Sequence, residues 1–166
     1  GTMEQLIVTP LQASEFILGK TIPFILIAQG QMAMVILFAR LWFGIPMAGN
    51  AFVLLAASSI FLLSTLGVGL LISTVSRTQQ QAMMTNFFFI LPFFILSGFV
   101  FPIANMPATV QWLTHLNPLS HFLIIIRGVF LKGVGFAILW PQFLELALLG
   151  GFVFTLAVRR FRKRID

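Results

Sequence analysis

Of the 166 residues in this chain, 59% are hydrophobic and only 8% are charged, which excludes a water-soluble globule because too few polar side chains remain to cover one. The formal net charge of +6 does not indicate a nucleic-acid partner, since five of the ten basic residues gather at 159–164, as they do where a basic flank ends a membrane span. Cysteine is absent, which excludes a disulfide framework, a cysteine-based metal site and a thiol nucleophile.

The first twenty residues are mixed in polarity and contain two Thr-x-x-Gln patterns, which begin at Thr2 and Thr9 and are typical of helix starts. Pro10 follows the second threonine and suits the first position of a helix. Such a helix would have an apolar side and a polar side that includes Glu15, as helices at a membrane surface do. We therefore predict a surface helix within 1–20, with an ordinary connecting helix as the alternative.

Two uncharged stretches follow, over 21–39 and 51–75. Each is long enough to cross the hydrocarbon core of a bilayer, which takes roughly 20 apolar residues. Pro23 falls in the first turn expected for the first helix, where its missing N–H matters little. The loop between the stretches holds Arg40 beside Trp42, a pair suited to the headgroup boundary. The pattern predicts two spans joined at one membrane face.

Small residues recur at four-residue intervals in the second stretch, at Thr65, Gly69 and Ser73. They share one face of a helix. Because small side chains let helices approach closely in a membrane, this face is the predicted contact with a neighbouring helix.

The apolar stretch 82–100 contains Pro92 near its middle, so we expect a third span that is kinked or broken there. From 101 to 139 the pattern loosens, and the apolar run 122–126 is too short to cross. Irregular backbone at membrane depth must be covered by protein or water. We therefore expect a re-entrant or surface-lying helical segment over 101–139 at the outer face.

The last apolar stretch, 140–158, ends at the basic tail 159–166. Four spans put both ends of the chain on one side of the membrane. Seven basic residues then lie on that side and three on the other, so the positive-inside rule places both termini in the cytoplasm. The sequence predicts an all-α, multi-pass membrane protein, with its transmembrane domain over 21–158 surrounded by membrane lipids.

Glu145 is the only acidic residue in an apolar span, where an ionisable group costs about 3 kcal/mol unless it reaches water or a partner. Arg127 on the preceding segment is the partner we expect first, with Lys132, a neighbouring subunit or water near the outer interface as alternatives. His115 and His121 lie six residues apart with no cysteine or nearby aspartate to complete a ligand set, so we predict no metal site.

The chain offers no Ser/His/acid set or paired carboxylates for catalysis. Residues 18–21 end like a phosphate-binding loop, but Ser14 stands where the earlier glycine is required, so the backbone could not cradle a phosphate. We therefore predict no catalytic, cofactor-binding or metal residues. The Phe-rich runs 87–89 and 93–94 face lipid by default, with a hydrophobic substrate route as the alternative.

A series of short motifs runs in order through nearly the whole chain. They include GTMEQL at 1–6, TPL at 9–11, GLLIS at 69–73, TQQQA at 78–82, LSG at 96–98, NP at 117–118, RG at 127–128 and KG at 132–133. In this order they resemble the type-2 ABC exporter permeases. The resemblance implies a six-span subunit, of which this chain would be the part after the second span. It also implies a dimer of identical or different permeases, each docked on a separate ATP-binding subunit that would hold ATP and Mg²⁺.

The resemblance further implies export of a hydrophobic or amphipathic, drug- or lipid-like compound across a cell membrane, the bacterial inner membrane. It matches 1–20 to the family's coupling helix and 102–132 to its outer re-entrant helices. The residues that would couple the chain to the ATPase are Thr2, Glu4, Thr9, Pro10, Glu15 and Lys20. The candidates for an intramembrane or outer-gate role are Glu145, Arg127, Pro92, Pro102, Pro107 and Pro118.

Two other functional classes fit the same composition. An ATP-independent channel or secondary carrier would use Glu145 with Arg127 as its ion-sensitive element, although intramembrane charge is sparse for that role. A membrane anchor or assembly subunit without a transport role needs no more than the helices. A broken third span and a structured outer segment would argue against the anchor.

Overall fold

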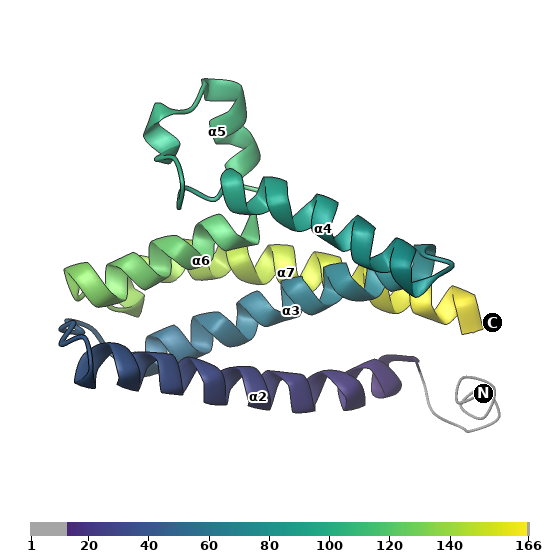
Figure 1. Ribbon diagram of the computed structural model, residues 1–166, viewed down its shortest axis with the longest axis horizontal. Helices are drawn as coiled ribbons and strands as arrows, with labels where there is room; N and C mark the ends of the chain where they lie inside the picture. The colour runs from purple at the N-terminus through teal and green to yellow at the C-terminus, as the bar shows by residue number, and fades with distance from the viewer. Residues whose placement is uncertain (1–12, 166) are drawn as a thin grey trace.

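The computed structural model describes residues 13–165, which form a bundle of helices (Figure 1). The predicted all-α class is confirmed for this range, which holds six α-helices and no strand. Thr2, Glu4, Thr9 and Pro10 lie outside the described residues. In chain order the elements are α2 (Ala13–Leu41), α3 (Ala51–Val75), α4 (Gln79–Ile95), the 3-10 helix η1 (Ile103–Asn105), α5 (Ala108–Thr114), α6 (Pro118–Arg127), the π-helical turn η2 (Gly128–Lys132) and α7 (Phe136–Ile165).

Three of these helices are long and apolar enough to cross a membrane, within Leu18–Leu41, Ala51–Val75 and Phe136–Phe161. They contain three of the predicted spans, 21–39, 51–75 and 140–158. α3 packs along α7 and also contacts α2 (Figure 1). These three predictions therefore correspond to helices of the required length and composition.

The third predicted span, 82–100, is not such a helix. α4 has 17 residues, about 25 Å at 1.5 Å per residue, against a hydrocarbon core of about 30 Å. It continues through Pro92 instead of breaking there, and ends where Ser97 Oγ donates to the Phe94 carbonyl at 2.6 Å. Gly98 follows with φ +94°, a conformation that favours glycine. The turn at Ser97 and Gly98, rather than the proline, therefore ends α4. The predicted count of four spans is not confirmed, because α4 is not among the helices long enough to cross.

α4 begins at a local capping motif. Thr78 Oγ1 accepts a hydrogen bond from Gln81 N at 3.1 Å, and Gln81 Oε1 accepts one from Arg77 N at 2.9 Å. Side-chain oxygens thereby satisfy backbone N–H groups at the helix start. The polar run 77–81 thus forms the short turn after α3 and the first residues of α4.

α2 is continuous over Ala13–Leu41, so the helix of the N-terminal segment does not end before the first span. The expectation that Pro23 lies in a first helical turn is wrong, because this proline is inside α2. Residues 13–20 contain no proline, and Gly19 alone is too weak a stop signal to end the helix. Pro23 removes a single backbone hydrogen bond, to the Gly19 carbonyl, and the helix tolerates this loss.

The predicted outer segment 101–139 is helical in short pieces. α6 packs on α3 and α7, whereas α5 stands away from the bundle (Figure 1). Prolines mark the helix starts: Pro102 precedes η1, Pro107 precedes α5, and Pro118 opens α6 behind the cap residue Asn117. The depth of this segment in a membrane stays a prediction.

The bundle core lies where α2, α3, α6 and α7 meet. Close van der Waals packing of apolar side chains from all four helices holds them together, because lipid is as apolar as the side chains and gives no hydrophobic driving force between membrane helices. The buried side chains of this core are Ile36, Leu54, Ala57, Phe122, Ile125, Val129, Leu139, Phe143 and Leu146.

α3 and α7 pack closely at Gly67. A Cβ atom added there would lie 2.9 Å from Val153 Cγ1 and 3.1 Å from Phe154 N. A Cβ atom at Gly69 would meet nothing within 4 Å, and Thr65 is exposed. The helix contact therefore uses the face that carries Gly67, and the predicted face of small residues does not make it in the described part of the chain.

Polar side chains join α2 to α3. Gln29 Nε2 donates to the Leu55 carbonyl at 3.1 Å and to Ser59 Oγ, while Ser58 Oγ donates to Gln29 Oε1 at 3.2 Å. Hydrogen bonds between membrane helices contribute roughly 0.6–2 kcal/mol each. This cluster fixes which side of α2 faces α3.

Candidate functional site

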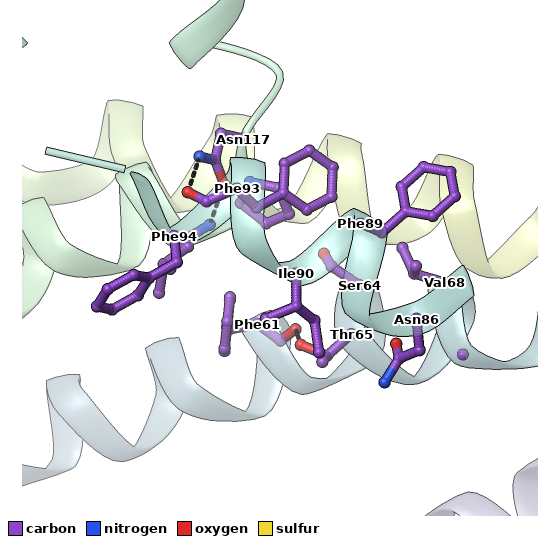
Figure 2. Close-up of a pocket in the computed structure, with 13 residues that line it drawn as sticks. Phe61, Ser64, Thr65, Val68, Asn86, Phe89, Ile90, Phe93, Phe94 and Asn117 are labelled. Carbon is purple, nitrogen blue, oxygen red and sulfur yellow. Dashed lines mark hydrogen bonds between the residues drawn. The ribbon is translucent and has the colours of Figure 1, made fainter. Parts of the chain in front are cut away.

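A cavity of about 410 Å³ lies between α3, α4 and the start of α6 (Figure 2). Its volume is in the range of roughly 300–1,000 Å³ that is typical of small-molecule sites. The residues that line it are Phe61, Ser64, Thr65, Val68, Gly69, Asn86, Phe89, Ile90, Phe93, Phe94, Asn117, Pro118 and Leu119.

Phenylalanines of α4 supply much of the cavity wall. Phe89, Phe93 and Phe94 line it, whereas Phe87 and Phe88 are exposed and do not. The wall residues recur at three- and four-residue intervals, so they share one face of the helix. Helix geometry thus divides the run 87–89, whereas both residues of the run 93–94 line the cavity.

The cavity has few polar groups. Thr65 Oγ1 is satisfied within its own helix, because it donates to the Phe61 carbonyl at 2.9 Å. Asn117 Nδ2 donates to the Phe93 carbonyl at 2.7 Å, a bond drawn dashed in Figure 2. Asn86 is exposed, and its amide makes no hydrogen bond with the described residues. An apolar cavity with one such amide suits a compound with a large apolar part and a polar group.

The predicted pair of Glu145 with Arg127 is not formed. Arg127 Nη2 donates to the Gly98 carbonyl at 3.1 Å, which ties the end of α6 to the turn after α4. Glu145 Oε2 instead lies 3.0 Å from His121 Nδ1 and 3.7 Å from His115 Nδ1. His121 and Arg127 are six residues apart on α6, about one and two-thirds turns, so they lie on different faces. The fold turns the histidine, not the arginine, toward α7.

The four prolines singled out from the sequence do not share one site. Pro118 lines the cavity, Pro92 lies inside α4, and Pro102 and Pro107 cap short helices. Their common role in the structure is to start or permit helices. Only Pro118 is placed to affect a ligand in the cavity.

Glu15 and Lys20 lie near the start of α2. Lys20 Nζ is 4.9 Å from the ring centroid of Phe16, and that ring stacks on Phe161 of α7 with centroids 5.2 Å apart. The start of α2, the turn between α3 and α4, and the end of α7 lie at one end of the bundle (Figure 1). Basic residues of these three segments, Lys20 and Arg77 among them, therefore share one end of the bundle, and the side of the membrane that this end faces stays a prediction.

The ABC-2 type transporter family matches residues 1–131 of this chain. The probable multidrug ABC transporter permease YbhR of Escherichia coli strain K12 is 36% identical over 166 residues, which are 99% of this chain and 45% of that protein. The probable multidrug ABC transporter permease YbhS of the same strain is 39% identical over 137 residues, 80% of this chain and 36% of that protein. The inner membrane transport permease YhhJ, also from strain K12, is 30% identical over 167 residues, 99% of this chain and 44% of that protein.

The chain spans less than half the length of each of these relatives. No solved structure matches it significantly. The relatives carry the names of transport permeases rather than enzymes, in agreement with the three helices that are long and apolar enough to span a membrane. The predicted family is confirmed, and the chain belongs to the ABC-2 type transporter family.

Proposed function

We propose that this chain is the membrane part of a permease subunit in an ATP-driven exporter, which moves a hydrophobic or amphipathic, drug- or lipid-like compound out of the cytoplasm or the inner leaflet. The apolar cavity between α3 and α4, with its aromatic wall, carries this proposal. Such a site holds a compound through apolar area and orients it through a few polar groups, here the Asn86 amide. The names of YbhR and YbhS, probable multidrug permeases, fit a site that selects for apolar area.

ABC-2 permeases in general work as dimers with ATP-binding partners. In this proposal ATP and Mg²⁺ bind to a separate ATP-binding subunit, and a second permease copy, identical or different, completes the route. The partner would dock at the end of the bundle that carries Lys20 and Arg77, because basic residues gather on the cytoplasmic side of membrane proteins. The protein would then lie in the bacterial inner membrane, with both ends of the chain in the cytoplasm.

α4 is the third of four crossings in this proposal. With only 17 residues it falls short of the full hydrocarbon thickness, so the segment 101–139 would cover its outer end as a re-entrant structure. The bond from Arg127 to the Gly98 carbonyl supports this arrangement, because it holds α6 against the turn that ends α4. The outer segment and α4 would therefore move together.

The start of α2 would transmit the conformational change of the ATP-binding subunits to the cavity. Glu15 and Lys20 lie there, beside the stack of Phe16 on Phe161 that connects α2 with the end of α7. Closure of the ATP-binding subunits would push on the N-terminal segment and change the packing of these helices between two states. A carrier without ATP is less well supported, because the Glu145–Arg127 pair that it needs is not formed. An anchor without a transport role does not account for the cavity.

The experiment that tests the proposal is a transport assay in proteoliposomes, with ATP supplied outside so that only complexes with the ATP-binding side outward are energised. The purified permease is reconstituted with the ABC ATP-binding subunit that copurifies with it, and uptake of a lipophilic fluorescent dye is followed with and without ATP. We expect uptake that needs ATP and that stops when the ATPase is inactivated. Uptake without ATP, or a permease that copurifies with no ATP-binding subunit, would refute the exporter assignment.

A further inference from the structure

Three side chains with metal-binding atoms converge where the end of α5, α6 and the first half of α7 meet. His115, His121 and Glu145 each offer one ligand atom, and these atoms lie within 4.8 Å of one another. Glu145 Oε2 is 3.0 Å from His121 Nδ1 and 3.7 Å from His115 Nδ1. Neighbouring ligands around a tetrahedral Zn²⁺ are about 3.3 Å apart, given bonds of about 2.0–2.1 Å. The separations of 3.0 and 3.7 Å fall on either side of that value.

The ring of His121 is held in the orientation and tautomer that a metal ligand needs. Its Nε2 atom lies 2.8 Å from the backbone carbonyl oxygen of His115, which can only accept, so Nε2 carries the proton. Nδ1 then presents a lone pair toward Glu145 Oε2 and toward Gln142 Oε1, which is 2.7 Å away. Metal-bound histidines are arranged in this way, with one ring nitrogen on the metal and the other donating to a carbonyl.

This group of atoms needs a hydrogen-bond donor or a cation among them. The Nδ1 lone pair of His121, the Glu145 carboxylate and the Gln142 amide oxygen are all acceptors, and the His121 side chain is only 3% exposed. Acceptors that face one another around a buried ring need a donor or a cation between them. A second proton on His121, or a Gln142 amide turned so that its NH2 group donates to Nδ1, would also satisfy the group. A histidine–carboxylate ion pair and this amide hydrogen bond are therefore the alternatives that a test must separate from a bound metal.

We propose that His115, His121 and Glu145 form a binding site for a divalent transition-metal ion of the Zn²⁺ type. Two imidazole nitrogens and one carboxylate suit such an ion, whereas Mg²⁺ and Ca²⁺ prefer oxygen ligands throughout. The side chains of His115 and Glu145 are 64% and 41% exposed, which leaves a path for the ion and a position for a water molecule as fourth ligand. The bound ion links α5, α6 and α7, and so fastens the outer segment to the last span. The site does not depend on the proposed export function.

The test uses Co²⁺ as the probe, because it replaces Zn²⁺ and absorbs visible light in a tetrahedral site. The purified permease in lipid nanodiscs is titrated beside His121→Gln, Glu145→Gln and the control Glu15→Gln, which removes a carboxylate on α2. We expect one Co²⁺ per chain, displaced by Zn²⁺ but not by Mg²⁺ or Ca²⁺. Each site substitution should raise the dissociation constant at least about 10-fold, since even second-shell changes cost about 10- to 100-fold, and the control should leave it unchanged.

Thermal unfolding measurements distinguish a variant that has lost metal binding from one that is misfolded. His115→Gln changes an exposed side chain and leaves the buried His121 ring untouched. We expect Zn²⁺ to raise the unfolding temperature of the wild type and of Glu15→Gln, and not of His115→Gln, since an ion that binds the folded state stabilises it. A wild type without saturable Co²⁺ binding overturns the proposal and leaves the ion pair or the amide hydrogen bond. Binding that the site substitutions do not weaken overturns it as well, because the ion then binds elsewhere.

Discussion

The side-chain amide of Asn117 donates to the carbonyl oxygen of Phe93 at 2.7 Å, and so joins the cap of α6 to the last turn of α4. The same side chain accepts from Leu119 N at 3.1 Å and is buried. One residue therefore caps a helix and closes one end of the cavity. The bond to Leu119 N is local, whereas the bond to Phe93 joins residues 24 apart in sequence, and together they fix where the outer segment meets α4.

Replacement of Asn117 by alanine should destabilise the protein. The change leaves the Phe93 carbonyl without its side-chain donor and the first turn of α6 without its cap, and the combined loss is about 1–3 kcal/mol. Thermal unfolding in detergent measures the effect. Asn105→Ala is the matched control, because Asn105 is exposed in η1. Equal unfolding temperatures for the two variants would contradict the role of Asn117.

The cavity wall gives a paired test of ligand binding on a single helix. Phe89→Ala removes an aromatic ring that lines the cavity, whereas Phe87→Ala removes one that does not. We expect Phe89→Ala to weaken binding of an apolar dye about 10- to 100-fold, which corresponds to the loss of about 1.5–3 kcal/mol of apolar contact. Fluorescence titration of the purified permease measures it. If both variants bind the dye equally well, the cavity is not the binding site.

The close packing of α3 on α7 at Gly67 predicts opposite results for two glycines. Gly67→Ala would place a Cβ atom 3.1 Å from Phe154 N, a backbone atom that cannot rotate away. Overpacking of this kind costs about 1–3 kcal/mol. Gly69→Ala meets nothing within 4 Å and should leave the unfolding temperature unchanged or slightly higher. A Gly67 variant as stable as the Gly69 variant would show that the two helices separate easily at this crossing.

Single cysteines can decide whether α4 crosses the membrane. The chain has no cysteine of its own, so a cysteine at Gln80, in the first turn of α4, or at Asn105, in η1, gives one labelling site within it. We expect a membrane-impermeant maleimide to label the two positions from opposite sides of sealed vesicles. Labelling of both from the same side would mean that α4 enters the bilayer without crossing it.

Substitutions in the N-terminal segment test the coupling assignment. Thr9→Ala and Glu15→Ala should lower the ATPase activity that the transported compound stimulates, and they should leave binding of an apolar dye unchanged, because the cavity lies on α3, α4 and α6. The ATPase assay uses the reconstituted complex. Normal assembly together with normal stimulated ATPase activity would place the coupling elsewhere.

Long apolar stretches were the part of the fold that the sequence could predict. The membrane-spanning parts of α2, α3 and α7 can be predicted from the apolar composition of roughly 20 consecutive residues. This prediction does not require knowledge of which other helices pack against them. The end of α4 could not be read in the same way. The sequence continues apolar to Val100, but the Ser97 hydroxyl and the left-handed Gly98 end the helix through local hydrogen bonding and backbone conformation.

The partner of Glu145 lay beyond what the sequence could predict. His115 and His121 precede it by 30 and 24 residues, and only the turn between α5 and α6 brings both rings to the same part of α7. Arg127 is nearer in sequence and always charged, which made it the first choice. Its guanidinium instead satisfies the Gly98 carbonyl, an acceptor that becomes free only because α4 ends early.

Gln29 holds α2 in one orientation against α3 through hydrogen bonds to Leu55 and Ser59. Most of the surface of this helix is exposed, and its bonds to Leu55 and Ser59 are directional. Rotation of α2 by one residue, roughly 100°, would break them and leave a bare amide in lipid, where an unpaired polar group costs several kcal/mol. The Gln29 bonds therefore hold α2 at one rotation and one register against α3.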